Sequence, residues 1–233
     1  MAARHVCFAR TPGFGTKVGP LNMTAETSEM EKYFLLEPDS TRDGRGHGVV
    51  FENAKRLVDP PRLVLRPHEG GIPKFKEVPR LVYSPAKGEP PEDLEGGMSG
   101  YWLVSKRLKD VLERTDPAGF EFAECDYRLA DGSSGPTYFL CDVVRVLNAV
   151  DEEASQLNIE ISDKYYAGKH YSFSGGARLS FRDEVVGSAH VFRTPYSGNY
   201  IVCDRVLRDE IVDAGIWSAA RSNGIWFIDA ADI

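Results

Sequence analysis

The feature that most constrains this fold is a weak internal repeat, in which an apolar strand runs through a polar turn into an amphipathic helix. The first copy spans residues 103–112, and the second spans residues 201–211 with one extra residue. Ser105 and Asp204 stand where each helix would begin, and both residue types are preferred N-caps. A glycine and a later aromatic strand follow each copy, at Gly119 and 120–122 in the first and at Gly215 and 226–228 in the second.

Two copies about a hundred residues apart are too few for a solenoid, which needs three or more short repeats. They predict one α+β fold with mixed or antiparallel sheets, a few amphipathic helices and two similar strand–helix–strand units. An internal duplication explains the pattern, and so does chance similarity between two ordinary amphipathic helices. The residues leave both explanations open.

Around the repeat, the chain has an irregular beginning and a longer patterned part. Residues 1–29 combine Pro and Gly steps with a polar run, which predicts an irregular N-terminal extension. We expect residues 30–233 to form a single domain. Residues 84–100 hold three Pro and four Gly, which predicts a loop and a boundary between two lobes, 30–95 and 96–233.

Short apolar runs bounded by turn residues predict the strands. Residues 33–36 are expected to form a buried strand that ends at Pro38. An amphipathic helix is expected over residues 106–114, and Asp131-Gly132 predicts a hairpin turn. Further strands are predicted at 62–65, 80–83, 101–104, 120–127 and 137–141.

The charge of the chain restricts its partners. The formal net charge is −7, and residues 81–233 carry 25 acidic against 15 basic side chains. An acidic body repels phosphate backbones, so we expect no direct binding of nucleic acid. The same charge would attract a basic partner, and salt would weaken that attraction.

Neither a membrane span nor an export signal is apparent. No stretch approaches the roughly 20 apolar residues that cross a bilayer, and the first thirty residues lack the apolar centre of a secretory signal. The four cysteines contain no C-x-x-C pair, which favours reduced thiols. We therefore expect a cytoplasmic protein that does not contact membranes.

No set of residues forms a catalytic signature, although three features leave alternatives open. Asp39 and Asp43, with Glu37 nearby, could bind a divalent metal, and Cys203 lies between a strand and a helix, where a thiol could act as a nucleophile. These residues would suit a metal-dependent hydrolase or nuclease. The glycine-rich segment 44–48 could hold a small anion in a regulatory ligand-binding module. Each feature is more typical of a turn or a core position, so we expect no enzyme activity, no metal and no cofactor.

Four segments together resemble a known family. They are Lys32-Tyr-Phe-Leu-Leu-Glu-Pro-Asp39, Tyr101-Trp-Leu-Val-Ser-Lys-Arg-Leu-Lys-Asp-Val-Leu112, Tyr138-Phe-Leu-Cys-Asp-Val-Val-Arg-Val-Leu-Asn-Ala-Val-Asp151, and the second strand–helix unit from Tyr200 to Gly215. From about Met30 to Ile228, the chain is similar to the eleventh numbered family of bacterial polymorphic-toxin immunity proteins, formerly a domain of unknown function. The N-terminal extension and the aromatic tail at 217–227 depart from this pattern.

The resemblance implies a non-enzymatic inhibitor that binds a cognate secreted toxin before the toxin harms the producer or a sibling. Such toxins are often nucleases delivered by contact-dependent or type VI secretion machinery. The family supplies no shared set of binding residues, so none is carried over. An acidic surface suits a nuclease because it could occupy the basic groove in place of phosphate.

Two acidic clusters and two tryptophans are the predicted contacts with the toxin. The clusters are the Glu92-Asp93-Leu94-Glu95 loop and the Asp151-Glu152-Glu153 turn. Trp102 and Trp217 are candidate anchors, because tight interfaces usually contain a buried aromatic side chain. The alternative is that the clusters are solvated and the tryptophans belong to the core. Whether the protein forms a homodimer stays open.

Overall fold

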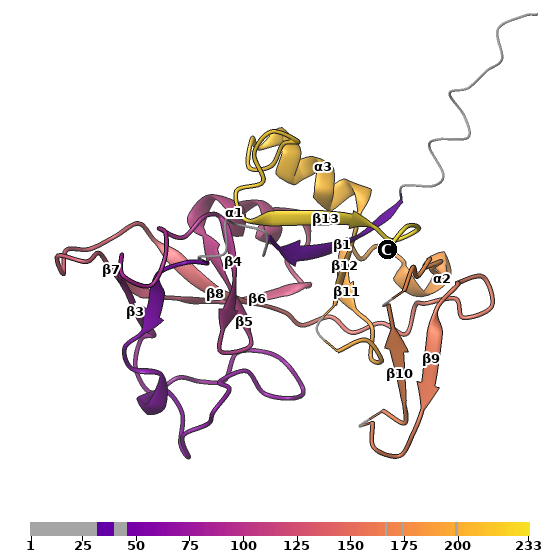
Figure 1. The fold of residues 1–233 in the computed structure, drawn as a ribbon, viewed down its shortest axis with the longest axis horizontal. Helices are drawn as coiled ribbons and strands as arrows, with labels where there is room; N and C mark the ends of the chain where they lie inside the picture. Colours follow the sequence, from indigo (N-terminus) through magenta and orange to yellow (C-terminus); the bar gives the residue numbers. More distant parts are fainter. Residues whose placement is uncertain (1–31, 40–45, 166, 174, 199) are drawn as a thin grey trace, which may run out of the picture.

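The computed structural model describes residues 32–39, 46–165, 167–173, 175–198 and 200–233 (Figure 1). The predicted extension at 1–29, and Asp43 and Gly44 of the candidate ligand sites, lie outside the described residues. The described part is α+β and mostly strand, as predicted, with two four-stranded antiparallel sheets at its centre. None of the helices in these ranges is long and apolar enough to cross a membrane.

The first copy of the repeat lies in a sheet with the order β4-β5-β8-β6. Strands β5 and β6 both run antiparallel to β8 between them, so they are parallel to each other. Helix α1 connects β5 to β6, the two strands that flank β8. The elements are β4 (Leu94–Met98), β5 (Tyr101–Ser105), α1 (Lys106–Thr115), β6 (Phe120–Glu124) and β8 (Tyr138–Val143).

The second copy has the same arrangement in a sheet with the order β11-β12-β1-β13. Strands β12 and β13 both run antiparallel to β1, and helix α3 connects them. The middle strand comes from the start of the described chain, whereas β8 follows its own helix. The elements are β1 (Tyr33–Pro38), β11 (Val191–Arg193), β12 (Ile201–Asp204), α3 (Arg205–Asp213) and β13 (Ile225–Asp229).

The strand registers make the two units equivalent residue by residue. Tyr138 of β8 lies opposite Ser105, and Tyr33 of β1 lies opposite Asp204. The middle strands also have similar sequences, Tyr-Phe-Leu-Leu-Glu from 33 to 37 and Tyr-Phe-Leu-Cys-Asp from 138 to 142. Aligned on the caps, the two strand–helix segments need no extra residue, in contrast to the alignment made from sequence. This shared topology is what an internal duplication predicts.

Both predicted N-caps are confirmed. Ser105 Oγ accepts a hydrogen bond from the Leu108 amide at 3.3 Å, and Asp204 Oδ1 accepts one from the Leu207 amide at 3.0 Å. Leu108 and Leu207 are then the first buried residues of their helices. Each cap therefore ends a strand and begins a helix at the same position of its unit.

The two helices pack against each other on one side of the sheets, where they cover a shared core. Figure 1 shows α1 and α3 together at the top of the molecule. The opposite faces of the two sheets bury separate clusters under smaller elements. These elements are β2 (Val49–Phe51), η1 (Ala54–Arg56), β3 (Arg80–Tyr83), β7 (Asp126–Arg128), β9 (Asn158–Ile161), β10 (Lys169–Ser172) and α2 (Asp183–Val186).

The smaller elements lie at opposite ends of the molecule. Strands β3 and β7 pair in parallel at one end, and the β9–β10 hairpin projects at the other (Figure 1). Strand β7 arises because the strand predicted over 120–127 breaks at Cys125. Sequence analysis made no prediction for β2, η1, β9, β10, β11 or α2.

Two predictions about the loops are wrong. Residues 62–65 form no strand: Leu63 is 99% exposed, and the Leu65 amide donates to Ser99 Oγ at 2.9 Å instead of to a neighbouring strand. The stretch 84–100 contains an edge strand, β4, whose register shifts between Glu95 and Met98. Gly97 has φ +75° at this irregularity, a conformation that glycine adopts easily. A lobe boundary at residues 95 and 96 would cut this strand.

A buried carboxylate, Asp142 of β8, connects three regions. Its side chain is fully buried and accepts hydrogen bonds from Arg66 Nε at 2.7 Å and Arg193 Nη2 at 3.0 Å. The Gly71 amide donates to its second oxygen at 2.6 Å. Arg66 comes from the loop before β3 and Arg193 from β11, so Asp142 joins both sheets to the loop that covers them.

Asp116, directly after α1, makes the second charged contact between the units. It accepts hydrogen bonds from the Arg145 guanidinium and from the amides of His190 and Val191, which lead into β11. Burial alone would raise the pKa of Asp116, but these hydrogen bonds outweigh it and hold the pKa below its usual range. We call Asp116, Asp142 and their arginine partners the buried seam.

Candidate partner-binding surface

Two carboxylates of the first predicted acidic cluster are buried and accept hydrogen bonds from within the protein. Asp93 is 5% exposed and accepts hydrogen bonds from Ser105 Oγ at 2.5 Å and from Arg107 Nε at 2.7 Å. Glu95 is equally buried, and its Oε1 accepts the Glu92 amide at 2.7 Å. Asp93 and Glu95 thus support the first helix cap and the β4 edge. A role for Glu92, Asp93 and Glu95 in binding stays a prediction.

The second predicted cluster is a surface turn joined to the β9–β10 hairpin. Asp151 Oδ1 accepts the amides of Glu153 and Ala154, both at 3.1 Å, which fixes the turn. Glu152 Oε1 accepts hydrogen bonds from Lys169 and, at 2.6 Å, from Tyr171 Oη of β10. The Lys169 and Tyr171 hydrogen bonds lower the pKa of Glu152. The exposed Glu153 is left facing solvent.

Strand β9 extends this acidic surface. Residues 151–165 hold five acidic side chains and one basic one, and we call this segment the acidic arm. Glu160 and Asp163 are exposed, and Ile161 between them is 84% exposed. Within the described chain, β9 pairs with β10 alone, so its outer edge is open. A single exposed apolar residue is common on protein surfaces, so the open strand edge and the negative charge are what this segment offers a partner.

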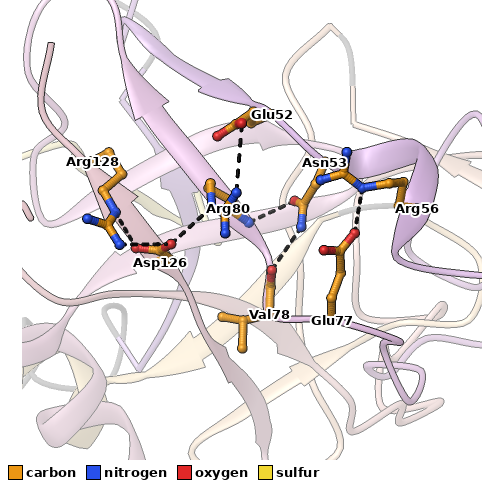
Figure 2. Close-up of polar contacts among 8 residues, drawn as sticks. All are labelled: Glu52, Asn53, Arg56, Glu77, Val78, Arg80, Asp126 and Arg128. Carbon is orange, nitrogen blue, oxygen red and sulfur yellow. Dashed lines mark hydrogen bonds and ion pairs between the residues drawn. The ribbon is translucent and has the colours of Figure 1, made fainter. Parts of the chain in front are cut away.

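Charges at the other end of the molecule are paired with one another (Figure 2). Asp126 of β7 accepts hydrogen bonds from Arg80 Nε at 3.0 Å and Arg128 Nε at 2.7 Å. Figure 2 also shows Arg56 with Glu77, and Arg80 directed toward Glu52. Three arginines and three carboxylates therefore form a neutral network that holds β7 against β3. The acidic arm, by contrast, presents a net negative charge.

The two predicted tryptophans have different surroundings. Trp217 packs at 81° against Phe227, with ring centroids 5.5 Å apart, and covers the core on the side of the helices. Trp102 is half-buried in β5 and lines a cleft of about 510 Å³ between the two sheets. Trp226 of β13, which sequence analysis did not single out, is 42% exposed.

The cleft also contains a residue that sequence analysis named only beside a candidate metal site, and not as a partner contact. Glu37, near the end of β1, lines it together with Tyr200 and the glycines of the β4–β5 hairpin. Glu37 is half-buried, and burial raises the pKa of its carboxyl group. Its neighbour across the β1–β13 pair is Trp226. The acidic residue at this position was identifiable from the match between the two Tyr-Phe-Leu segments.

Two of the residues proposed for catalysis, Cys203 and Asp39, lie in the described part of the chain. Cys203 is completely buried, and burial raises the pKa of its thiol well above the usual range. Asp39 accepts a hydrogen bond from Ser222 Oγ at 2.8 Å. Among the described residues, no group of three or more His, Cys, Asp or Glu side chains is placed to hold a metal ion.

Comparison with known proteins identifies the family of this chain. The sequence model described as Immunity protein family (Imm11) matches residues 32–232, nearly the whole chain. A search of curated proteins finds no match. The family match covers both strand–helix–strand units and the acidic arm. The chain therefore belongs to the Imm11 immunity protein family.

Proposed function

We propose that this protein neutralises a cognate secreted antibacterial toxin by binding its toxic domain directly in a stoichiometric complex. The observation that carries the proposal is the family match over residues 32–232. Inhibition by binding needs no chemistry from the inhibitor. The toxin would belong to a polymorphic system, such as one delivered by type VI secretion, and the complex would form in the cytoplasm.

The acidic arm supports a basic toxin domain, and a nuclease is the class we favour. A nuclease binds phosphate through Arg and Lys, and the arm offers carboxylates that can make charge-assisted hydrogen bonds to the same groups. Ile161, the last residue of β9, adds an exposed apolar contact between Glu160 and Asp163. Charge would speed association, and the apolar contact would slow dissociation.

The test is co-expression with the toxin encoded by the neighbouring gene, followed by titration of the purified pair. We expect full protection of the cells and a one-to-one complex. Affinity should fall as salt rises, because the contact is partly electrostatic. Unchanged toxicity, or protection without any complex, would contradict the proposal.

Charge reversal tests the role of the arm. The double variant Glu153→Lys/Asp163→Lys should bind the toxin on the order of tenfold more weakly and show a smaller salt dependence. The double variant Asp209→Lys/Asp213→Lys is the matched control, because it changes the net charge by the same amount at two exposed residues of α3, on the helical side. Equal weakening by both variants would show that the arm acts only through net charge.

A further inference from the structure

The two units place one carboxylate each at matching positions of their middle strands. Asp142 is the fifth residue of Tyr-Phe-Leu-Cys-Asp in β8, and Glu37 is the fifth of Tyr-Phe-Leu-Leu-Glu in β1. In both sheets, the tyrosine of this segment lies opposite the helix cap. The two acids therefore occupy equivalent places in two copies of one sheet.

Their surroundings differ completely. Asp142 is buried and bonded to the guanidinium groups of Arg66 and Arg193. Glu37 is half-buried, and no hydrogen bond or ion pair joins its carboxylate to the described part of the chain. A carboxylate removed from water without a partner is unfavourable, which the raised pKa of Glu37 reflects.

The sequence of the edge strands explains the difference. Val191 pairs with Cys203 in one sheet, and Leu94 pairs with Val104 at the equivalent place in the other. Two residues further along each edge strand stand Arg193 and Gly96. Strand β11 contacts β8, and β4 contacts β1 in the same way. Gly96 therefore occupies the position from which an arginine would reach Glu37.

The space left by Gly96 is the cleft between the sheets. An added Cβ at Gly96 would lie 3.3 Å from Pro38 Cγ, next to Glu37. The cleft volume of about 510 Å³ falls within the range of roughly 300–1,000 Å³ that is typical of ligand sites. Trp102 and Tyr200 line it with aromatic surface, and Arg193 also borders it while its guanidinium pairs with Asp142. A carboxylate beside aromatic rings is suited to a planar cation, which can pair with one and stack on the other.

We propose that this cleft binds an arginine side chain of the partner, whose guanidinium pairs with Glu37 and lies against Trp102. This inference rests on the proposed function only because it names the toxin as the source of that arginine. The bound side chain would supply to the second sheet the contact that Arg193 supplies to the first. Arginine is favoured over lysine because its planar group both stacks and forms two parallel hydrogen bonds to a carboxylate.

The chemistry of the cleft can be tested without a toxin. Nα-acetylarginine amide is titrated into ¹⁵N-labelled protein, and Nα-acetylcitrulline amide, which has nearly the same shape but no charge, is the control. We expect saturable shifts of the Trp102 indole and of the Gly96 and Gly97 amides, with a dissociation constant on the order of 1 mM. The citrulline compound should bind at least tenfold more weakly. Equal binding of the two compounds, or the absence of saturable shifts at these residues, would overturn the proposal.

Two variants address the same contact from within the chain. Glu37→Gln should abolish the preference for arginine over citrulline and raise the melting temperature, because it removes an unpaired charge. Gly96→Arg should place a guanidinium beside Glu37, block the probe and also raise the melting temperature. In the double variant, the stabilisation by Gly96→Arg should disappear. A Glu37→Gln variant that is less stable and still prefers the arginine probe would contradict the assignment.

Binding to the toxin separates this inference from the proposed function. Glu37→Gln should weaken the complex at least tenfold although the free protein is no less stable. If the variant binds the toxin as tightly as the wild type, the arginine contact is wrong and the immunity function stands. If the wild type binds the arginine probe but inhibits no toxin, the proposed function is wrong and the assignment of the cleft as a guanidinium site stands.

Discussion

The two strand–helix–strand units share a topology, a register and a cap position, yet they use one equivalent carboxylate in opposite ways. In the first unit, Asp142 is closed off by two arginines of the same chain. In the second unit, Glu37 borders an open cleft and has no such partner among the described residues. The comparison teaches that one position can hold a fold together in one copy and remain available to a partner in the other.

The same contrast separates the buried seam from the acidic arm. Asp116 and Asp142 accept several hydrogen bonds each and join the units. Glu153, Glu160 and Asp163 lie on the surface of the arm. Carboxylates of the first kind should affect stability when they are replaced, and those of the second kind should affect binding.

The largest expected effect comes from removing Asp142, the carboxylate that is paired with two arginines. Asp142→Ala leaves two buried guanidinium groups without a counter-charge, so the free energy of unfolding should fall by about 3–5 kcal/mol. Urea unfolding followed by circular dichroism measures this change. Glu37→Ala is the matched control and should lower stability far less, because no partner is lost. Similar losses for both variants would show that the two carboxylates are equivalent after all.

Asp116→Asn is expected to have the next largest effect, a loss of about 2–3 kcal/mol, because charged hydrogen bonds between the units are weakened. Its pH dependence provides a second readout. The folded-state pKa of Asp116 is lowered, so its stabilisation is present above the ordinary carboxyl pKa and is lost as pH falls through the folded pKa. The difference between wild type and variant should be constant near neutral pH and shrink below about pH 4. A difference that stays constant into acid would contradict this account.

The helix caps should show the equivalence of the units most directly. Ser105→Ala and Asp204→Ala each remove the oxygen that accepts the amide of the third helical residue, and each should lower stability by about 1 kcal/mol. Ser105 also donates to Asp93, and Asp204 also contacts His190 Nδ1 at 2.8 Å. Thermal unfolding of the two variants and their double variant tests whether the caps act independently.

The smallest effect on stability is expected in the acidic arm. Glu160→Lys or Glu153→Lys should change the free energy of unfolding by less than about 0.5 kcal/mol, because neither residue is buried. Differential scanning fluorimetry provides the measurement. A clear loss of stability would show that these side chains stabilise the fold, as those of the buried seam do. It would remove the basis for treating the arm as a binding surface.

The elements that could be predicted from sequence are those with strong local signals. The caps at Ser105 and Asp204 and the strand that begins at Tyr33 follow from residue type and apolar spacing. The β9–β10 hairpin has only a short, partly exposed pattern, which resembles a loop. Residues 62–65 are apolar enough for a strand, but Ser99 takes the amide of Leu65, and tertiary contacts decided the outcome.

The site was harder to predict, because a run of acids does not reveal which side chains face inward. Asp93 and Glu95, next to and within the edge strand β4, are buried, whereas Glu153 of the second cluster is exposed. Trp102 was singled out and lines the cleft. Sequence analysis named Glu37 only beside a candidate metal site and within a strand, since its place in the cleft depends on Gly96, almost sixty residues away, lacking a side chain.

The position of β1 between β12 and β13 has a consequence for synthesis of the protein. Among the described strands, this apolar strand is synthesised before all the others, and its partners at 201–204 and 225–229 are about 165 and 190 residues further along the chain. At about 5–20 residues per second, the nascent strand waits roughly 10–40 s for both neighbours. The second sheet is therefore completed only after Asp229 has been added, and a chain cut short before Ile225 leaves its middle strand unpaired on one side.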